Sequence, residues 1–144
     1  ASARGVVITK NNNISWAIID SSIITDLPDS WITNKNFIIL AANCGKSSYT
    51  NVVLGDVTCD SDGCYPVQDS ETKHIAIPDT SEELYLVVVG TGAYQRLLTG
   101  DGGAHHCGVP DPKTVVITKS EGKKIVSLKS SQTTSDIMNI LGYK

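Results

Sequence analysis

Short hydrophobic segments, rich in isoleucine and valine, recur along the chain and are separated by clusters of turn-forming residues. Such β-branched runs between glycine, proline and aspartate clusters are typical of β-strands. The pattern predicts strands at residues 5–9, 14–24 (with a break at 20–22), 37–41, 52–57, 84–89, 114–118 and 125–128. Because no long helix separates these runs, the sequence predicts a mostly β fold, an antiparallel β-barrel or sandwich, rather than a parallel sheet.

One short helix and one C-terminal helix complete the predicted fold. Residues 94–99 allow at most one or two helical turns, and residues 135–141 predict a helix near the C-terminus. Thr134 or Ser135 is expected to cap that helix, because hydroxyl side chains satisfy the first backbone N–H groups. Asp136 then lies in the first turn, where a carboxylate suits the helix dipole.

Length and charge limit the classes of function. The chain has 144 residues and a formal net charge of −3 at pH 7. This length predicts a single domain over residues 1–144 and excludes a complete (β/α)₈ barrel, which needs about 250 residues. Without a clustered basic surface we expect no nucleic-acid partner, and without a run of about 18 apolar residues we expect no membrane span.

Four cysteines, Cys44, Cys59, Cys64 and Cys107, leave the compartment open. A secreted protein would be expected to join them in two disulfides, with three pairings available, whereas a cytosolic protein would keep free thiols. The glycosylation signal at residues 13–15 is compatible with secretion. The sequence favours an extracellular location, and both compartments stay open.

Two segments resemble metal sites without matching one. The acidic loop at residues 56–63 resembles a calcium loop, but Asp69 stands where that motif needs a glutamate. His105, His106 and Cys107 are adjacent, and neighbouring residues on a strand point to opposite faces, so they do not easily converge on one ion. No metal is therefore predicted.

Two motifs, read together, are similar to a known enzyme family. Residues 58–63 read Thr-Cys-Asp-Ser-Asp-Gly, and residues 92–95 read Gly-Ala-Tyr-Gln. In this order they resemble the C-terminal β-domain of pyridoxal-phosphate-dependent arginine decarboxylases of the plant and bacterial biosynthetic type, which belong to the group IV decarboxylases. The similarity extends to residues 23–31, 103–106, 112–116 and 135–141.

The resemblance implies roles for three residues. In the family a separate barrel domain holds the cofactor, the active site forms between two subunits, and the β-domain reaches into it. Carried over, Cys59 and Asp60 contact the far end of the substrate, and Tyr94 contacts the cofactor phosphate. A carboxylate can pair with a guanidinium through two parallel hydrogen bonds, and a phenol is a good donor to phosphate.

Structural roles for these three residues stay open beside the functional ones. Cys59 could form a disulfide with Cys64, Asp60 could close an Asx turn, and Tyr94 could pack with its hydroxyl at the surface. Ala1 and Ala3 stand where the family has a glutamate and a glycine that contact the cofactor. The chain alone is thus expected to hold no cofactor, and pyridoxal phosphate enters only with a barrel chain.

These observations lead to three hypotheses. The first is a stand-alone, non-catalytic descendant of the arginine decarboxylase β-domain with a binding or defence role. The second is the processed small chain of an arginine decarboxylase, which converts arginine to agmatine in polyamine biosynthesis, in the plastid or cytoplasm. The third is a small-molecule or sugar-binding module. A homodimer or a barrel chain are the expected partners, and arginine or agmatine the expected ligands.

Overall fold

The computed structural model describes residues 2–3, 8–11, 14–67, 73–95 and 106–143. The chain divides into two compact units, residues 1–98 and 99–144, and each is described by itself. The expected single domain over residues 1–144 stays a prediction. Within the described residues, no helix is long and apolar enough to cross a membrane.

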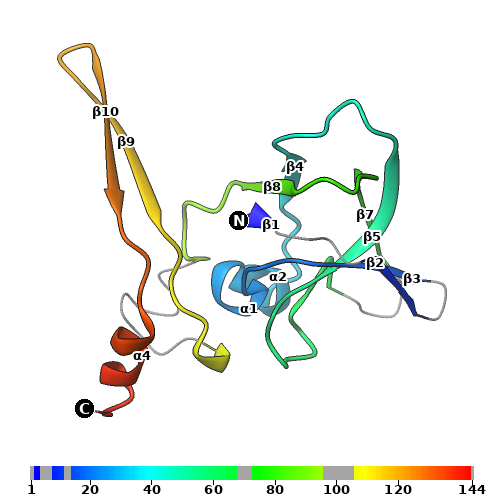
Figure 1. Ribbon diagram of the computed structural model, residues 1–144, viewed down its shortest axis with the longest axis horizontal. Helices are drawn as coiled ribbons and strands as arrows, with labels where there is room; N and C mark the ends of the chain where they lie inside the picture. The colour runs from blue at the N-terminus through cyan, green and yellow to red at the C-terminus, as the bar shows by residue number, and fades with distance from the viewer. Residues whose placement is uncertain (1, 4–7, 12–13, 68–72, 96–105, 144) are drawn as a thin grey trace. The chain divides into compact units, whose positions relative to one another are not determined.

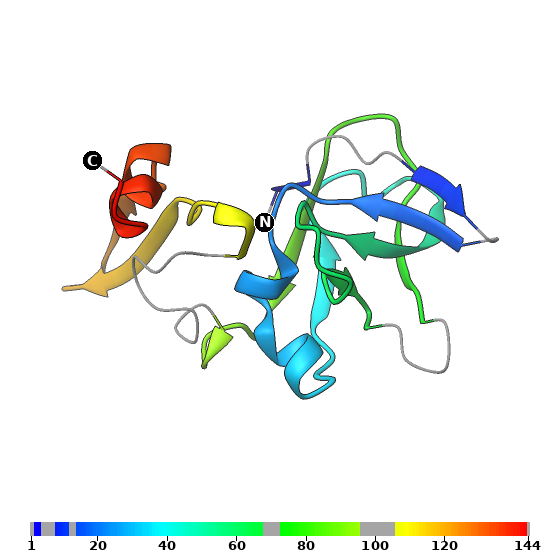
Figure 2. The ribbon, with the colours of Figure 1, turned by 90° about the horizontal axis from the view of Figure 1, so that it is seen from below.

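The first unit consists of two small sheets (Figure 1). One has the strand order β1-β8-β4, and the other has the order β2-β3-β5-β6, with β7 also paired to β5. The strands are β1 (Ser2–Ala3), β2 (Ile8–Asn11), β3 (Ile14–Ile18), β4 (Ile38–Ala41), β5 (Tyr49–Gly55), β6 (Cys64–Tyr65), β7 (Ile75–Pro78) and β8 (Leu84–Val89). All pairs are antiparallel except β3 with β5, which is parallel (Figure 2).

The mostly β prediction is confirmed, and the sheets are not closed into a barrel. Instead, a helix pair follows β3, with α1 at Ile23–Asp26 and α2 at Pro28–Ile32. The strand predicted over residues 14–24 therefore ends early, and residues 28–32 are helical. Ser22 accepts a hydrogen bond from the Thr25 N–H and so caps α1, while Pro28 begins α2 with a pre-set φ. These local signals outweigh the β-branched composition of the run.

The hydrophobic core of the first unit lies between the two sheets and α1. It comprises Ala17, Ile19, Ile23, Leu27, Phe37, Val52, Leu54, Tyr65, Ile77, Leu84 and Leu86. Strand β8 shows the alternation that builds it, because Leu84 and Leu86 are buried while Tyr85 and Val87 are exposed. The two sheets and the helix pair thus share one hydrophobic core, and the loops discussed below connect these elements.

The second unit consists of a hairpin and a helix. Strands β9 (Thr114–Ser120) and β10 (Lys123–Lys129) pair antiparallel, and Glu121 and Gly122 both have positive φ, as the tight hairpin turn requires. A single 3₁₀ turn, η1, spans His106–Gly108, and α4 spans Thr134–Ile140.

The predicted C-terminal helix is confirmed with a different cap. The side chain of Thr133, rather than of Thr134 or Ser135, accepts from the Asp136 N–H. The Asp136 carboxylate accepts in return from the Thr133 N–H, which completes a capping box. Of the short helix predicted at residues 94–99, only its first positions lie in the described part, and Gln95 is helical there.

Candidate active-site loops

The loop after β5 carries the predicted substrate residues, and its anchor is the carboxylate of Asp56. Its Oδ2 accepts from the Ile23 N–H of α1 at 2.8 Å, and its Oδ1 accepts from the Thr58 N–H at 2.7 Å and the Thr58 hydroxyl at 2.6 Å. The Asp56 N–H donates to the carbonyl of Gly63 at 2.8 Å, which closes the loop. A Cβ at position 63 would lie 2.4 Å from Asp56 Oδ1, so only glycine fits beside this anchor.

Within this loop, Asp60 is half-buried and Cys59 is exposed. Asp60 Oδ1 accepts from the Asp62 N–H at 2.9 Å, which is the Asx turn considered as the structural role. A carboxylate has about four lone-pair positions and can accept several hydrogen bonds, so an Asx turn does not by itself exclude a second acceptor role for Asp60.

The second predicted site residue, Tyr94, lies in the turn after β8. Its φ is +65°, in the left-handed region, and its side chain is 70% exposed. The alternative in which Tyr94 packs against the protein therefore does not hold, because the phenol is mostly in solvent.

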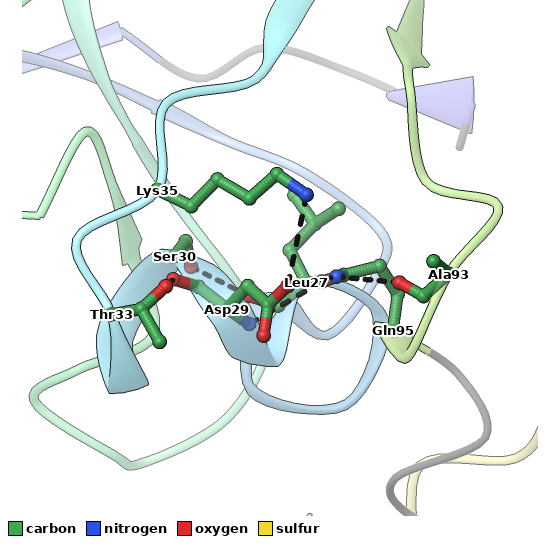
Figure 3. Close-up of polar contacts among 7 residues, drawn as sticks. All are labelled: Leu27, Asp29, Ser30, Thr33, Lys35, Ala93 and Gln95. Carbon is green, nitrogen blue, oxygen red and sulfur yellow. Dashed lines mark hydrogen bonds and ion pairs between the residues drawn. The ribbon is translucent and has the colours of Figure 1, made fainter.

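Gln95, the residue after Tyr94, is 2% exposed and fixes the turn (Figure 3). Its Nε2 donates to Asp29 Oδ2 at 2.6 Å and to the Ala93 carbonyl at 3.0 Å, and its Oε1 accepts from the Asp29 N–H at 3.3 Å. The Gln95 N–H also donates to the Ala93 carbonyl at 2.9 Å. The side chain of one buried glutamine thus joins the Gly-Ala-Tyr turn to α2.

Asp29 also contacts Lys35, through the same carboxylate oxygen that Gln95 bonds. Lys35 Nζ lies 3.7 Å from Asp29 Oδ2, an ion pair that Figure 3 shows. The same Nζ lies 5.1 Å from the centroid of the Phe37 ring, which adds a cation–π contact. The Asp29 carbonyl accepts from the N–H groups of Thr33 and Lys35. The acceptor used by Gln95 is therefore rigidly positioned.

Sequence reasoning proposed Cys59, Asp60 and Tyr94 as site residues, which stays a prediction, and it missed Asp56 and Gln95, which hold their loops. The signal for both was present, since each belongs to or adjoins one of the two motifs. Their partners, however, lie 33 and 66 residues away in the chain. The structure joins both loops to the same helix pair, α1 and α2.

The four cysteines are not joined in disulfides, which is one of the two states that the sequence left open. All four lie in described residues and are thiols. Cys59 is exposed, while Cys64 is buried in β6 with its Sγ 3.7 Å from the Ser61 carbonyl, so the two side chains lie in different environments. The Cys44 Sγ lies 3.9 Å from a carboxylate oxygen of Glu82.

His106 and Cys107 form a contact of their own in the second unit. The Cys107 Sγ lies 3.0 Å from His106 Nδ1, and Cys107 is exposed with a φ of +56°. His105 lies outside the described residues. Among the described residues no group of three or more His, Cys, Asp or Glu side chains is arranged to hold a metal ion.

The chain is similar in sequence to known arginine decarboxylases. No family model matches the chain. Arginine decarboxylase 1 of Oryza sativa subsp. japonica is 33% identical over 109 residues, which cover 72% of this chain and 15% of the rice protein. The chain spans only 15 to 20% of the length of the curated arginine decarboxylases that it matches.

Solved structures share the fold. The biosynthetic arginine decarboxylase of Campylobacter jejuni superposes with a TM-score of 0.69 at 23% identity, covering 90% of this chain and 22% of that one. A diaminopimelate decarboxylase gives a TM-score of 0.71 at 15% identity, covering 97% of this chain and 33% of that one. The chain is thus homologous to the C-terminal portion of the biosynthetic arginine decarboxylases, within the group IV decarboxylases.

Proposed function

We propose that this chain is the β-domain of an arginine decarboxylase site that a cofactor-binding barrel from another polypeptide segment completes. By itself the chain releases no carbon dioxide from arginine. The observation that carries the proposal is that the Cys59–Asp60 loop and the Tyr94 turn are both intact and both hydrogen-bonded to one helix pair. The loop that carries a carboxylate and the turn that carries a phenol are thereby attached to the same pair of helices.

Asp60 binds the guanidinium of arginine in this proposal. A guanidinium donates from a planar fork that matches a carboxylate, and the planar geometry selects arginine over a simple amine. The Asx-turn bond to the Asp62 N–H fixes the carboxylate plane, so less freedom is lost on binding. Cys59, exposed beside it, contacts the same end of the substrate.

Tyr94 donates its hydroxyl hydrogen to the cofactor phosphate. Its 70% exposure fits that task, because a donor to an external phosphate must not be consumed by internal bonds. Pyridoxal phosphate, when bound, supplies the electron-withdrawing ring that stabilises the charge left on the α-carbon as carbon dioxide departs. This chain supplies one contact to that group, and the remaining contacts belong to the barrel.

A chimeric enzyme tests the proposal. The barrel-bearing portion of the Campylobacter jejuni arginine decarboxylase would be joined to this chain in place of its own C-terminal portion. Carbon dioxide release from arginine by the chimera, and none from the barrel portion alone, is the expected result. A folded chimera that binds pyridoxal phosphate and leaves arginine unchanged would overturn the proposal.

Single substitutions in the chimera assign the roles. Asp60→Asn should lower kcat/KM for arginine about 10- to 100-fold, as expected for loss of a charge-assisted hydrogen bond. Tyr94→Phe should weaken the affinity for pyridoxal phosphate about tenfold and leave arginine recognition unchanged. Asp62→Asn removes an exposed charge from the same loop and is the matched control.

A stand-alone binding protein, with a defence or other non-catalytic role, is the second candidate. The observation that favours it is Ala1 and Ala3 at two positions where the family contacts the cofactor. This candidate expects the isolated chain to bind arginine or agmatine through Asp60. Saturation at about 100 times Kd would add about 2.7 kcal/mol to the free energy of unfolding, measurable by thermal shift. If neither arginine, agmatine nor simple sugars raised the unfolding temperature, the stand-alone binding protein would be excluded.

A further inference from the structure

We propose that Asp56 and Gln95 are positioning residues that fix Asp60 and Tyr94 relative to each other by tying both of their loops to the α1–α2 helix pair. The inference rests on the proposed function, in which Asp60 and Tyr94 are the two contact points. Neither Asp56 nor Gln95 touches the substrate or the cofactor in this account. Their effect passes through the backbone of the loops that they hold.

A continuous series of hydrogen bonds connects α1 to Asp60. The Ile23 N–H donates to one Asp56 oxygen, and the Thr58 hydroxyl donates to the other. The Thr58 Oγ1 in turn accepts from the Asp60 N–H at 3.4 Å. Because Asp56 is 9% exposed, water does not readily replace these bonds, and the first turn of α1 determines where Asp60 begins its turn.

A second series connects α2 to Tyr94. The Gln95 amide bonds both the backbone N–H and the carboxylate of Asp29, so its position and its orientation are both determined (Figure 3). The same amide nitrogen donates to the carbonyl of Ala93. Tyr94 lies between two residues that are locked together, which holds its left-handed backbone and directs its side chain to solvent.

The two anchors meet on the helix pair. Ile23 is the first residue of α1 and Asp29 lies in the first turn of α2, and the Leu27 N–H of the short connection bonds the Ile23 carbonyl at 2.9 Å. The span between the group that binds the substrate's far end and the group that binds the phosphate is therefore set by one rigid element. A fixed span of this kind selects substrates by length as well as by charge.

Isosteric substitutions separate positioning from stability. The Asp56 carboxylate accepts from Ile23 through one oxygen and from Thr58 through the other. Asp56→Asn keeps only one acceptor oxygen, so either the Ile23 or the Thr58 donors lose their acceptor. Gln95→Met keeps the volume and removes every side-chain hydrogen bond to Asp29. Asp62→Asn, in the same loop as Asp60 but exposed, is the control.

The measurement is the backbone order parameter of each loop by ¹⁵N relaxation, on the full chain well below its unfolding temperature. In the parent, Asp60 and Tyr94 should both show values near 0.85, those of rigid backbone. Asp56→Asn should lower the value at Asp60 below about 0.6 and leave Tyr94 rigid, and Gln95→Met should do the opposite. Asp62→Asn should change neither.

A rescue gives a second readout. Gln95→Glu places two carboxylates against each other and should loosen Tyr94. Gln95→Glu combined with Asp29→Asn restores the side-chain bond to position 29 with donor and acceptor exchanged, but not the bond to the Ala93 carbonyl, and should return the Tyr94 order parameter part of the way to the parent value. Loss of order in both loops together, or in neither, would overturn the proposal. Because these order parameters need no substrate or cofactor, an inactive chimera would count against the proposed function and leave this inference standing.

Discussion

At the scale of single residues, Tyr65 is a buried side chain held by two hydrogen bonds. Its hydroxyl accepts from the Phe37 N–H at 2.6 Å and donates to the Phe37 carbonyl at 2.8 Å, and the residue is 3% exposed. One phenol therefore satisfies both backbone groups of a buried residue before β4. Burial raises the pKa of the Tyr65 hydroxyl, and the hydrogen bond from Phe37 offsets part of that rise.

Tyr65→Phe should lower the free energy of unfolding by about 1–3 kcal/mol, because both polar groups of Phe37 lose their partner inside the core. Urea titration at pH 7 measures the loss. Tyr49→Phe, at a tyrosine that is 56% exposed, is the control and should change stability by less than about 0.5 kcal/mol. Equal effects of the two substitutions would contradict this account of Tyr65.

The same residue predicts an alkaline limit of stability. The folded-state pKa of Tyr65 lies above the unfolded-state value of about 10, so the unfolded chain releases this proton first. The contribution of the Tyr65 hydroxyl to the free energy of unfolding is therefore complete below about pH 10 and is lost as pH rises towards the folded-state pKa. Unfolding free energies measured from pH 8 to 11 should therefore fall more steeply in the parent than in Tyr65→Phe. Parallel slopes would exclude the effect.

At the scale of single elements, helix α4 depends on its capping box. Hydrogen bonds from the backbone and side chain of Thr133 lower the pKa of Asp136 below its usual value. The stabilisation is therefore present above the unfolded-state pKa, about 3.9, and is lost as pH falls through the lower folded-state pKa. The Hα and carbonyl shifts of residues 134–140 should lose helical character in acid over that range. In Asp136→Asn the shifts should stay flat there, and a midpoint at or above pH 4 in the parent would contradict the assignment.

The alternation of strand β8 predicts that substitutions at two neighbouring residues lower the free energy of unfolding by very different amounts. Leu86 is 4% exposed and belongs to the core, whereas Val87 is 46% exposed on the other face. Leu86→Ala should cost about 2–5 kcal/mol of unfolding free energy, and Val87→Ala less than about 1 kcal/mol. Denaturant titrations of both variants test the register of β8 against β4. Similar costs would show that the strand does not alternate as described.

Elements with local signals were predictable, and those fixed by distant contacts were not. Strand 84–89 and the last helix follow from hydrophobic periodicity, although the helix is capped by Thr133 rather than by Thr134 or Ser135. Strand β7, which pairs with β5, was missed because its four residues end in Pro78 and a proline argues against a strand. At the site, the motifs pointed to Asp60 and Tyr94 as candidates. They did not point to Asp56 and Gln95 as anchors, because no local pattern reveals a hydrogen-bond partner dozens of residues away.

At the scale of the whole molecule, apolar burial is distributed unequally. Every member of the core cluster lies between Ala17 and Leu86, in the first unit. In the described part of the second unit, Ile137 is the one buried hydrophobic residue, while the β9–β10 hairpin exposes side chains such as Val115 and Leu128. The free energy that resists local opening should therefore be concentrated where the proposed active-site loops are anchored.

Native-state hydrogen exchange should show this difference directly. Amides of β3, β5 and β8 should exchange only through global unfolding, because opening any of these strands exposes the shared core. The β9–β10 hairpin is hydrogen-bonded but buries little apolar area. Its amides should therefore exchange through local opening, with a free energy about 2 kcal/mol or more below that of global unfolding. Leu86→Ala provides the control, since it should speed exchange in β5 and β8 by the factor its stability loss predicts and leave the hairpin rates unchanged. Protection in the hairpin equal to that in β5 would mean that a second apolar core stabilises the hairpin, and that the first unit alone does not set the stability of the chain.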